Sequence, residues 1–156
     1  MRSRRKQGST EAALDAALIA CARKGLQLTE LRRDVLRLIL QSAGPSTAYQ
    51  LLSRLREQRP NATPPTVYRV LDFLVAQQLV HKVERLNAFV PCTEAHHHHD
   101  VPAQFLICSK CGNVAEIEDR AVSDALERAA ELKGFHPETT VVELAGTCAQ
   151  CFRPAQ

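Results

Sequence analysis

Apolar residues recur every three or four positions in four segments of the first half of the chain, and this spacing predicts four amphipathic helices. The segments cover about residues 10–24, 29–43, 47–58 and 63–76. Thr47 and Gln50 have the spacing of a capping box. Thr63 is a favourable N-cap before Pro64, whose missing N–H costs little in a first helical turn. The basic residues 1–9 predict an irregular arm that is solvated or contacts phosphate.

Two short apolar stretches follow the fourth helix, at residues 79–84 and 88–92, on either side of a turn at residues 85–87. Their composition and length predict a β-hairpin. Helices followed by a hairpin, in a basic segment, are typical of a winged helix-turn-helix, in which one helix enters the major groove of DNA. The fourth helix is the candidate recognition helix.

The pattern changes in the second half of the chain, where strands flank one further helix. The expected strands are residues 105–108, 114–118 and 139–144. Asp119 caps the expected helix, which ends at Gly134 and carries an apolar stripe of Val122, Leu126 and Ala129 that we expect to face inward. The fold class is therefore α+β, with a winged-helix domain at residues 1–91 and a small α/β domain at residues 92–156.

The charge of the chain is divided unevenly between these two parts. Residues 1–90 hold 15 Lys and Arg against 7 Asp and Glu, whereas residues 91–156 hold 5 against 10, which accounts for the net charge of +3. A basic first part suits a polyanion such as DNA. No targeting signal or stretch of membrane-spanning length is visible, so we expect a cytoplasmic protein, in which disulfides are disfavoured.

Four of the six cysteines form two CxxC pairs, Cys108 with Cys111 and Cys148 with Cys151. Two such pairs can supply four thiolates to one tetrahedral zinc ion. A redox role fits less well, because neither pair opens a helix in a thioredoxin-like unit. A closed shell of four thiolates leaves no open position for chemistry, so the predicted site is structural.

Further metal-binding residue types are divided between the two domains: His81, Cys92, the run from His96 to His99, and Glu116. A lone histidine on a strand is usually part of a core, but Cys92 ends the partner strand. A histidine of the run and Glu116 would complete four ligands, a set that suits zinc better than iron or manganese. Such an ion would fix the orientation of the domains and regulate the protein. Cys21, by contrast, lies on an apolar helical stripe and is expected to be a buried core thiol.

Four residues are candidates for DNA contact: Tyr49, Thr66, Tyr68 and Arg69. Arg69 can bond a guanine edge with two hydrogen bonds, which discriminates bases by about 1–3 kcal/mol. The start of the recognition helix is expected to offer free N–H groups to phosphate. The alternatives are that Tyr68 is a half-buried ring and that Arg69 pairs with Asp72.

Three segments carry a resemblance to a known family: TPPTVYRVLDFL at residues 63–74, VHKVE at residues 80–84, and FLICSKCG at residues 105–112. They resemble the ferric uptake regulator family, and the first segment, Cys92 and Glu116 look most like its zinc uptake branch. The resemblance implies a homodimeric repressor that binds AT-rich, inverted-repeat operators when loaded with zinc and silences zinc-uptake genes. It also implies that the second domain dimerises.

The same resemblance implies two zinc ions per subunit, one structural and one regulatory. It assigns the regulatory ion to His81, Cys92, Glu116 and one histidine of the run, for which we take His99, with His97 as second choice. An iron- or peroxide-responsive regulator of the same family is the main alternative, and Cys92 argues against it. A zinc hydrolase with Glu116 as its base is a remote alternative, because four ligands leave no open position, so we expect no enzyme.

Overall fold

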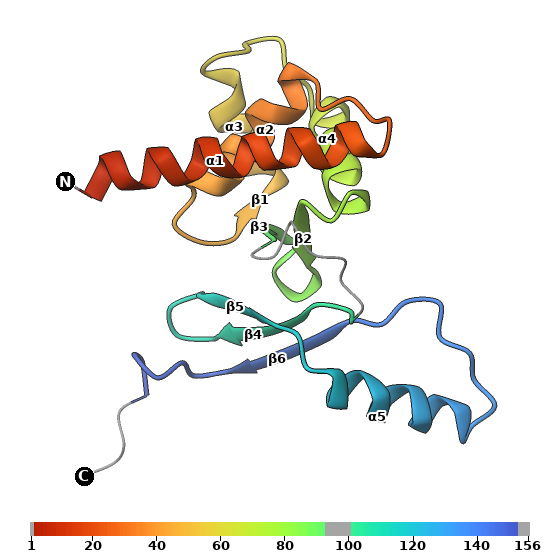
Figure 1. Ribbon diagram of the computed structural model, residues 1–156. Coiled ribbons are helices and arrows are strands. Elements are labelled where there is room, and N and C mark those ends of the chain that lie inside the picture. The colour runs from red at the N-terminus through yellow and green to blue at the C-terminus, as the bar shows by residue number, and fades with distance from the viewer. Residues whose placement is uncertain (1, 93–100, 153–156) are drawn as a thin grey trace. The chain divides into compact units, whose positions relative to one another are not determined.

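The structure is a computed structural model that describes residues 2–92 and 101–152, and within residues 2–8 it describes the backbone alone. The chain divides into two compact units, residues 1–97 and 98–156 (Figure 1). The division falls within residues 93–100, outside the described residues. The functional boundary between residues 91 and 92 stays a prediction.

The first unit is a winged helix-turn-helix, as the pattern predicted. Its helices are α1 (Arg2–Arg23), α2 (Glu30–Gln41), α3 (Ala48–Arg56) and α4 (Pro64–Ala76), and its strands are β1 (Ser46–Thr47), β2 (Val80–Val83) and β3 (Ala88–Pro91), with a 3-10 turn, η1 (Glu84–Leu86), between the last two. The three strands form an antiparallel sheet in the order β1-β3-β2. Leucine and valine side chains from all four helices, among them Leu14, Val35, Leu51 and Leu71, are completely buried in its core.

Local signals account for where α2 and α3 begin. The hydroxyl of Thr29 accepts the backbone N–H of Arg32 at 3.4 Å. At α3 the capping box is formed in both directions, because Gln50 N–H donates to the Thr47 hydroxyl at 3.2 Å and Thr47 N–H donates to the Gln50 side chain at 2.9 Å. These reciprocal bonds satisfy donors that a helix start otherwise leaves without partners.

The prediction of an irregular arm at residues 1–9 was wrong for residues 2–9, since α1 begins at Arg2. Arginine, lysine and glutamine are good helix formers, and this stretch contains no proline. The amphipathic helix therefore continues toward the N-terminus past its apolar stripe. In the described part of the chain, no helix combines the length and the apolar character needed to cross a membrane.

The second unit contains β4 (Gln104–Cys108), β5 (Val114–Ile117), α5 (Arg120–Glu131) and β6 (Val142–Gly146). Strand β4 is central, antiparallel to β5 and parallel to β6 (Figure 1). The side chain of Asp119 caps α5 as expected, accepting from Ala121 N–H at 2.8 Å. Strand β6 begins three residues later than predicted, because its register with β4 starts at the pairing of Gln104 with Val142.

Most of the predicted inward stripe of α5 is not covered by the described residues, and of its three members only Val122 is half-buried. Leu126 is 44% exposed, Ala129 is exposed, and the buried residue of the helix is Ser123. The Gln104 amide, which donates to the Ser123 hydroxyl at 3.3 Å, turns that face of the helix toward the sheet. The expectation was wrong because an apolar stripe shows that a helix has a partner surface, not that the same chain supplies it.

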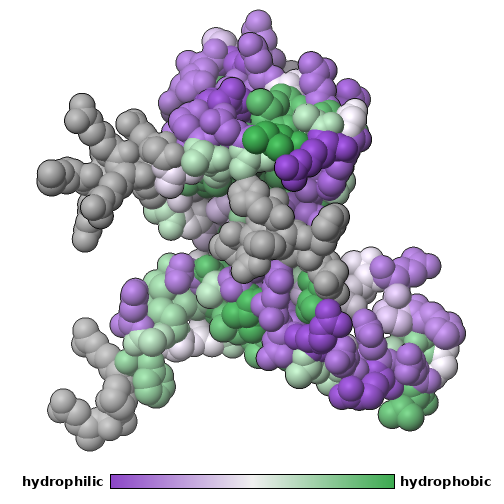
Figure 2. Space-filling model, in the orientation of Figure 1, coloured by the Kyte–Doolittle hydropathy of each residue, from purple (hydrophilic) through white to green (hydrophobic). Residues whose placement is uncertain are grey.

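Large apolar side chains also come to the surface over the sheet and beyond the end of α5, where Figure 2 shows hydrophobic residues on the second unit. The exposed set comprises Leu106, Ile117, Leu126, Leu132, Phe135, Val141, Leu144 and Phe152. A surface with so many exposed apolar residues is typical of an interaction site.

Candidate metal centre and DNA-reading helix

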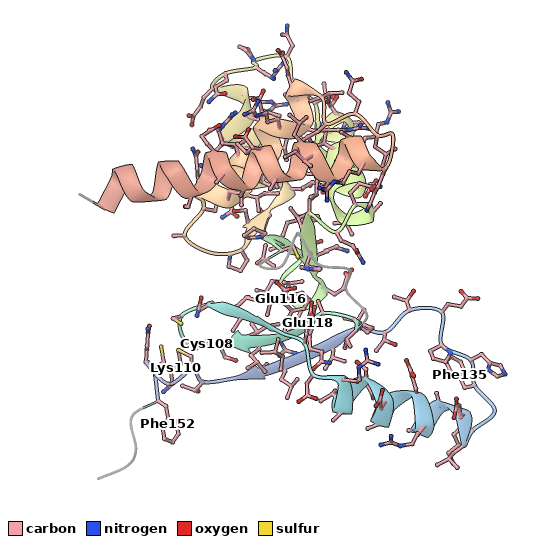
Figure 3. All side chains as sticks on the ribbon, viewed as in Figure 1. Cys108, Lys110, Glu116, Glu118, Phe135 and Phe152 are labelled. Carbon is pink, nitrogen blue, oxygen red and sulfur yellow. The ribbon has the colours of Figure 1, made fainter. Side chains whose placement is uncertain are left out.

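The four predicted cysteine ligands gather at one end of the second sheet. Their sulfur atoms all lie within 4.8 Å of one another, and the Sγ atoms of Cys111 and Cys148 are 3.8 Å apart. Figure 3 shows sulfur atoms at this end of the sheet, beside the labelled Cys108 and Lys110. Four thiolates bound to zinc at about 2.3 Å sit about 3.8 Å apart at the corners of a tetrahedron. The arrangement therefore fits a zinc ion.

The register of the sheet brings the two CxxC pairs together. Strands β4 and β6 run parallel and pair Cys108 with Gly146, so each pair follows the same end of its strand. A turn then folds the first pair back, with Gly112 N–H donating to the Cys108 carbonyl at 2.9 Å and Gly112 at φ +71°. That φ is easily reached by glycine and rarely by other residues.

Backbone N–H groups favour a negative charge on one of these sulfurs. Cys148 N–H donates to Cys108 Sγ at 3.4 Å. Hydrogen bonds from the backbone of Cys148 and then Cys111 lower the pKa of the Cys108 thiol to about 6, whereas the neighbouring thiol of Cys148 is the main cause that raises the pKa of Cys151 to about 12. The hydrogen bonds therefore favour a thiolate at Cys108 and keep the thiol of Cys151 protonated. A divalent cation removes this conflict, because it stabilises all four thiolates at once.

His81 and Cys92 form a second pair of metal-binding groups within the first unit. His81 on β2 pairs with Val90 on β3, and Cys92 N–H donates to the Leu79 carbonyl at 3.1 Å, which extends the ladder. Cys92 lies two residues beyond Val90 and hence on the same face of the hairpin as His81. Their ligand atoms lie within 4.8 Å of each other, and the Cys92 side chain is buried.

The remaining predicted ligands come from elsewhere. Glu116 lies on β5 in the second unit, half-buried, at the position that pairs with Phe105. The histidine run, including His97 and His99, lies outside the described residues. The structure thus brings together the four cysteines of one site and two residues of the other.

Helix α4 has one buried and one exposed face. Val67, Val70, Leu71 and Leu74 are buried in the core. The opposite stripe exposes Pro65, Tyr68, Arg69 and Asp72 at spacings of three and four residues. Tyr68 is 52% exposed, and no ion pair joins Arg69 to Asp72 within the described residues. Arg69 and Tyr68 are therefore available to a ligand, as is Tyr49 on α3, which is 80% exposed.

The expectation that α4 begins with free N–H groups was wrong. Pro64 and Pro65 carry no N–H, and the next two donors, from Thr66 and Val67, both bond the Thr63 carbonyl, at 3.1 and 3.2 Å. The hydroxyls of Thr63 and Thr66 bond each other at 2.9 Å, and the Thr63 side chain makes no capping bond to the backbone. Thr66 is thus held within the protein, and the start of α4 lacks the backbone donors that bind phosphate elsewhere.

Two arginines that the sequence reasoning missed hold the turn before α4. Arg59 donates to the Asp34 carboxylate on α2 at 2.8 Å, and Arg56 donates to the Ala62 carbonyl at 3.0 Å. Asp34 is mostly buried, which strengthens such a pair compared with an exposed one. No pattern could reveal the Asp34–Arg59 pair, because its members lie 25 residues apart on different elements.

Comparison with known proteins agrees with these features. The model of the ferric uptake regulator family matches residues 23–145. The chain belongs to the ferric uptake regulator family. The zinc uptake regulation protein of Escherichia coli K12 is 42% identical over 146 residues, which cover 92% of this chain and 83% of that protein.

Two solved structures of family members are close in fold and sequence. A zinc uptake regulator complexed with zinc and DNA superposes with a TM-score of 0.87 at 41% identity, covering 91% of this chain and 94% of that one. The crystal structure of holo XcZur superposes with a TM-score of 0.79 at 45% identity, covering 88% of this chain and 95% of that one. The family consists of transcription regulators, which confirms the expectation that the chain is no enzyme.

Cys21, the one cysteine assigned to neither metal site, is a core residue of the chain, as predicted. Its side chain is 1% exposed on α1, and burial is the main cause that raises the pKa of its thiol above 9.0. The thiol is therefore neutral in the folded protein under conditions where it ionises in the unfolded chain.

This difference predicts a pH dependence of stability. Because the folded pKa lies above the unfolded value, the contribution of Cys21 is complete below pH 9.0 and decreases as the pH rises above it. We expect the free energy of unfolding of the wild type, minus that of Cys21→Ala, to fall by at most about 1.4 kcal/mol per pH unit between the unfolded and the folded pKa, and to level off above the folded pKa. Urea unfolding of both proteins measures it, and a difference that does not change with pH would contradict a buried neutral thiol.

Proposed function

We propose that this chain is a zinc-responsive transcriptional repressor that binds operator DNA as a zinc-loaded homodimer and controls zinc-uptake genes in the cytoplasm. The observation that carries the proposal is a thiol–imidazole pair, Cys92 with His81, built into the wing of a unit that also exposes Tyr68 and Arg69 on its recognition helix. A metal-responsive DNA-binding protein needs both a metal-binding pair and an exposed recognition helix, and the first unit contains both. The relative solved with zinc and DNA supports the same reading.

Two zinc ions per subunit serve different purposes in this proposal. Cys108, Cys111, Cys148 and Cys151 hold the structural ion. Their four thiolates close its shell, so it joins the end of β4 to the segment after β6 and takes part in no exchange. His81, Cys92, Glu116 and a histidine of the run, His99 in preference to His97, hold the regulatory ion.

The regulatory ion acts by joining the two units. His81 and Cys92 belong to the first unit and Glu116 to the second. A ligand set divided in this way is complete only in one relative orientation of the units, so zinc favours that orientation over the others. If the favoured orientation is the one that fits DNA, zinc and operator each raise the affinity for the other by the same factor.

The exposed apolar face of the second unit supports homodimerisation. Leu106, Ala115 and Leu144 line a hollow of about 490 Å³ on the sheet, and the uncovered stripe of α5 contains Leu126. Burying such surface between two copies would remove it from water and stabilise the pair. A dimer also places two recognition helices on the two halves of an inverted repeat.

The DNA contacts follow from what α4 and α3 expose. Arg69 reads a guanine edge and Tyr68 contacts a thymine methyl or a phosphate. Tyr49, near the start of α3, meets the DNA backbone. Thr66, whose hydroxyl bonds Thr63, contributes through its methyl group or its remaining hydrogen-bonding capacity.

Operator binding with and without zinc tests the proposal. A duplex selected by the zinc-loaded protein from random sequences serves as operator, and binding is measured by fluorescence anisotropy over a range of salt concentrations. We expect binding to require zinc. The logarithm of the association constant should fall linearly with the logarithm of the salt concentration, with a slope of about −0.9 for each phosphate contacted. Equal affinity with and without a zinc chelator would overturn the zinc-responsive function.

Competition between zinc and ferrous iron tests the alternative signal. The thiolate of Cys92 is a soft ligand that favours zinc over iron in this set. We expect elemental analysis to find zinc at the regulatory site after equilibration with both metals. Retention of iron would instead indicate an iron- or peroxide-responsive regulator.

A further inference from the structure

The start of α4 differs from an ordinary helix N-terminus in its hydrogen bonding. Pro64 and Pro65 remove two donors, and Thr63 accepts the other two through its carbonyl. A helix that enters the DNA groove commonly holds a phosphate with these groups. Here no backbone N–H group at the start of α4 is available to a phosphate, so its side chains determine what this end of the helix can contact.

Two of those side chains are proline rings, and that of Pro65 shares a helix face with the DNA-reading residues. Pro65 is exposed and lies three and four residues before Tyr68 and Arg69, so its ring is on the same face of α4. Four residues of helix rise about 6 Å, and stacked base pairs are about 3.4 Å apart. The Pro65 ring is therefore placed within about two base pairs of the base that Arg69 contacts.

In the major groove the apolar group that a protein can recognise is the 5-methyl group of thymine. We propose that Pro65 is a specificity-determining residue whose ring packs on a thymine methyl beside the base read by Arg69. This inference rests on the proposed function, because it assumes that α4 enters the groove. The inference also accounts for the two prolines. They remove the N–H groups that would bind phosphate, and they supply an apolar ring that can contact a base.

Replacing individual thymines of the selected operator by uracil tests the contact, since uracil lacks only the methyl group. For the zinc-loaded wild type, we expect one position per half-site near the Arg69 contact to lose about fourfold in affinity, the effect of removing one buried methyl group. Pro65→Ala removes two ring carbons and is expected to bind the thymine and uracil operators equally at that position. The effects of the protein change and of the DNA change are then not additive, which is how a double-mutant cycle shows a direct contact.

Pro137→Ala is the matched control, because Pro137 is an exposed proline of the second unit, outside α4. It should keep the fourfold sensitivity of the wild type. If Pro65→Ala keeps that sensitivity at every thymine, while circular dichroism shows an intact fold, Pro65 makes no methyl contact and the inference is overturned.

Arg69→Ala separates this failure from failure of the proposed function. If Arg69→Ala loses discrimination at a guanine while Pro65→Ala keeps its methyl sensitivity, α4 still reads DNA and only the role of Pro65 is wrong. If neither variant changes operator binding, α4 does not enter the groove, and the DNA-reading assignment falls with the inference.

Discussion

Cys92→Ser is expected to abolish zinc-dependent operator binding while the protein stays folded and dimeric. Cys92 is the buried partner of His81 on the wing hairpin, and a serine hydroxyl is a poor ligand for zinc. Loss of a ligand should weaken zinc binding at this site by about 100-fold or more, since even residues that only orient a ligand contribute 10–100-fold. Without the ion, no force selects the orientation of the units that fits DNA.

Three measurements on Cys92→Ser give the expected pattern. Elemental analysis should find that the variant keeps the structural zinc and loses the regulatory one. Size-exclusion chromatography should show an unchanged dimer, and anisotropy should show operator affinity near the zinc-free level even in excess zinc. Cys21→Ala is the matched control, because it removes the other buried cysteine of the first unit and should leave both metal content and operator affinity unchanged. Normal zinc-dependent binding by Cys92→Ser would remove the regulatory site from consideration.

Cys148→Ala is expected to have the second large effect, the loss of the folded second unit. Its sulfur lies 3.8 Å from that of Cys111, and its N–H donates to Cys108, so it is central to the cluster. Structural zinc contributes on the order of 10–16 kcal/mol to the folding of small zinc domains. The second unit has few large buried side chains and exposes much of its apolar surface, so its own core cannot replace that contribution.

The variant should therefore lose the structural zinc, the dimer and operator binding together. Its helical signal should fall only in part, because α1 to α4 pack in a core of their own. Cys21→Ala again serves as control. A Cys148→Ala protein that is dimeric and binds operator would show that the cysteine cluster is dispensable for folding, and the cluster would need another role.

The two variants also distinguish the two proposed sites. Cys92→Ser separates metal response from assembly, whereas Cys148→Ala removes assembly itself. If both gave the same loss of dimer and fold, Cys92 would belong to the structural framework, and the division into one structural and one regulatory ion would fail.

Much of the fold was predictable because its signals are local. The capping box of Thr47 and Gln50 acts over three residues, and the apolar stripe of α2 repeats within twelve. The CxxC pairs have a spacing that suits a metal ion wherever the chain places them. The family resemblance of residues 63–74 added the expected partners and the role of the second domain.

The predictions that failed depended on which surface a side chain packs against and on which group accepts its hydrogen bond. The α5 stripe with Leu126 was correctly read as amphipathic, but the first turn of the helix packs on Gln104 through Ser123, and the described residues leave Leu126 and Ala129 uncovered. The sequence shows that Pro64 and Pro65 lack donors. It does not show that the N–H groups of Thr66 and Val67 bond the Thr63 carbonyl.

The amino-acid sequence by itself determined the helices, every strand except β1, the winged-helix order and the types of metal ligand, because periodicity, caps and thiol spacing act between near neighbours. Only the tertiary structure decided which ligands meet. The parallel register of Cys108 with Gly146 brings the two cysteine pairs together, and the pairing of His81 with Val90 sets Cys92 on the face of that histidine. Register is a property of hydrogen bonds between distant segments, so it is determined by the folded sheet as a whole.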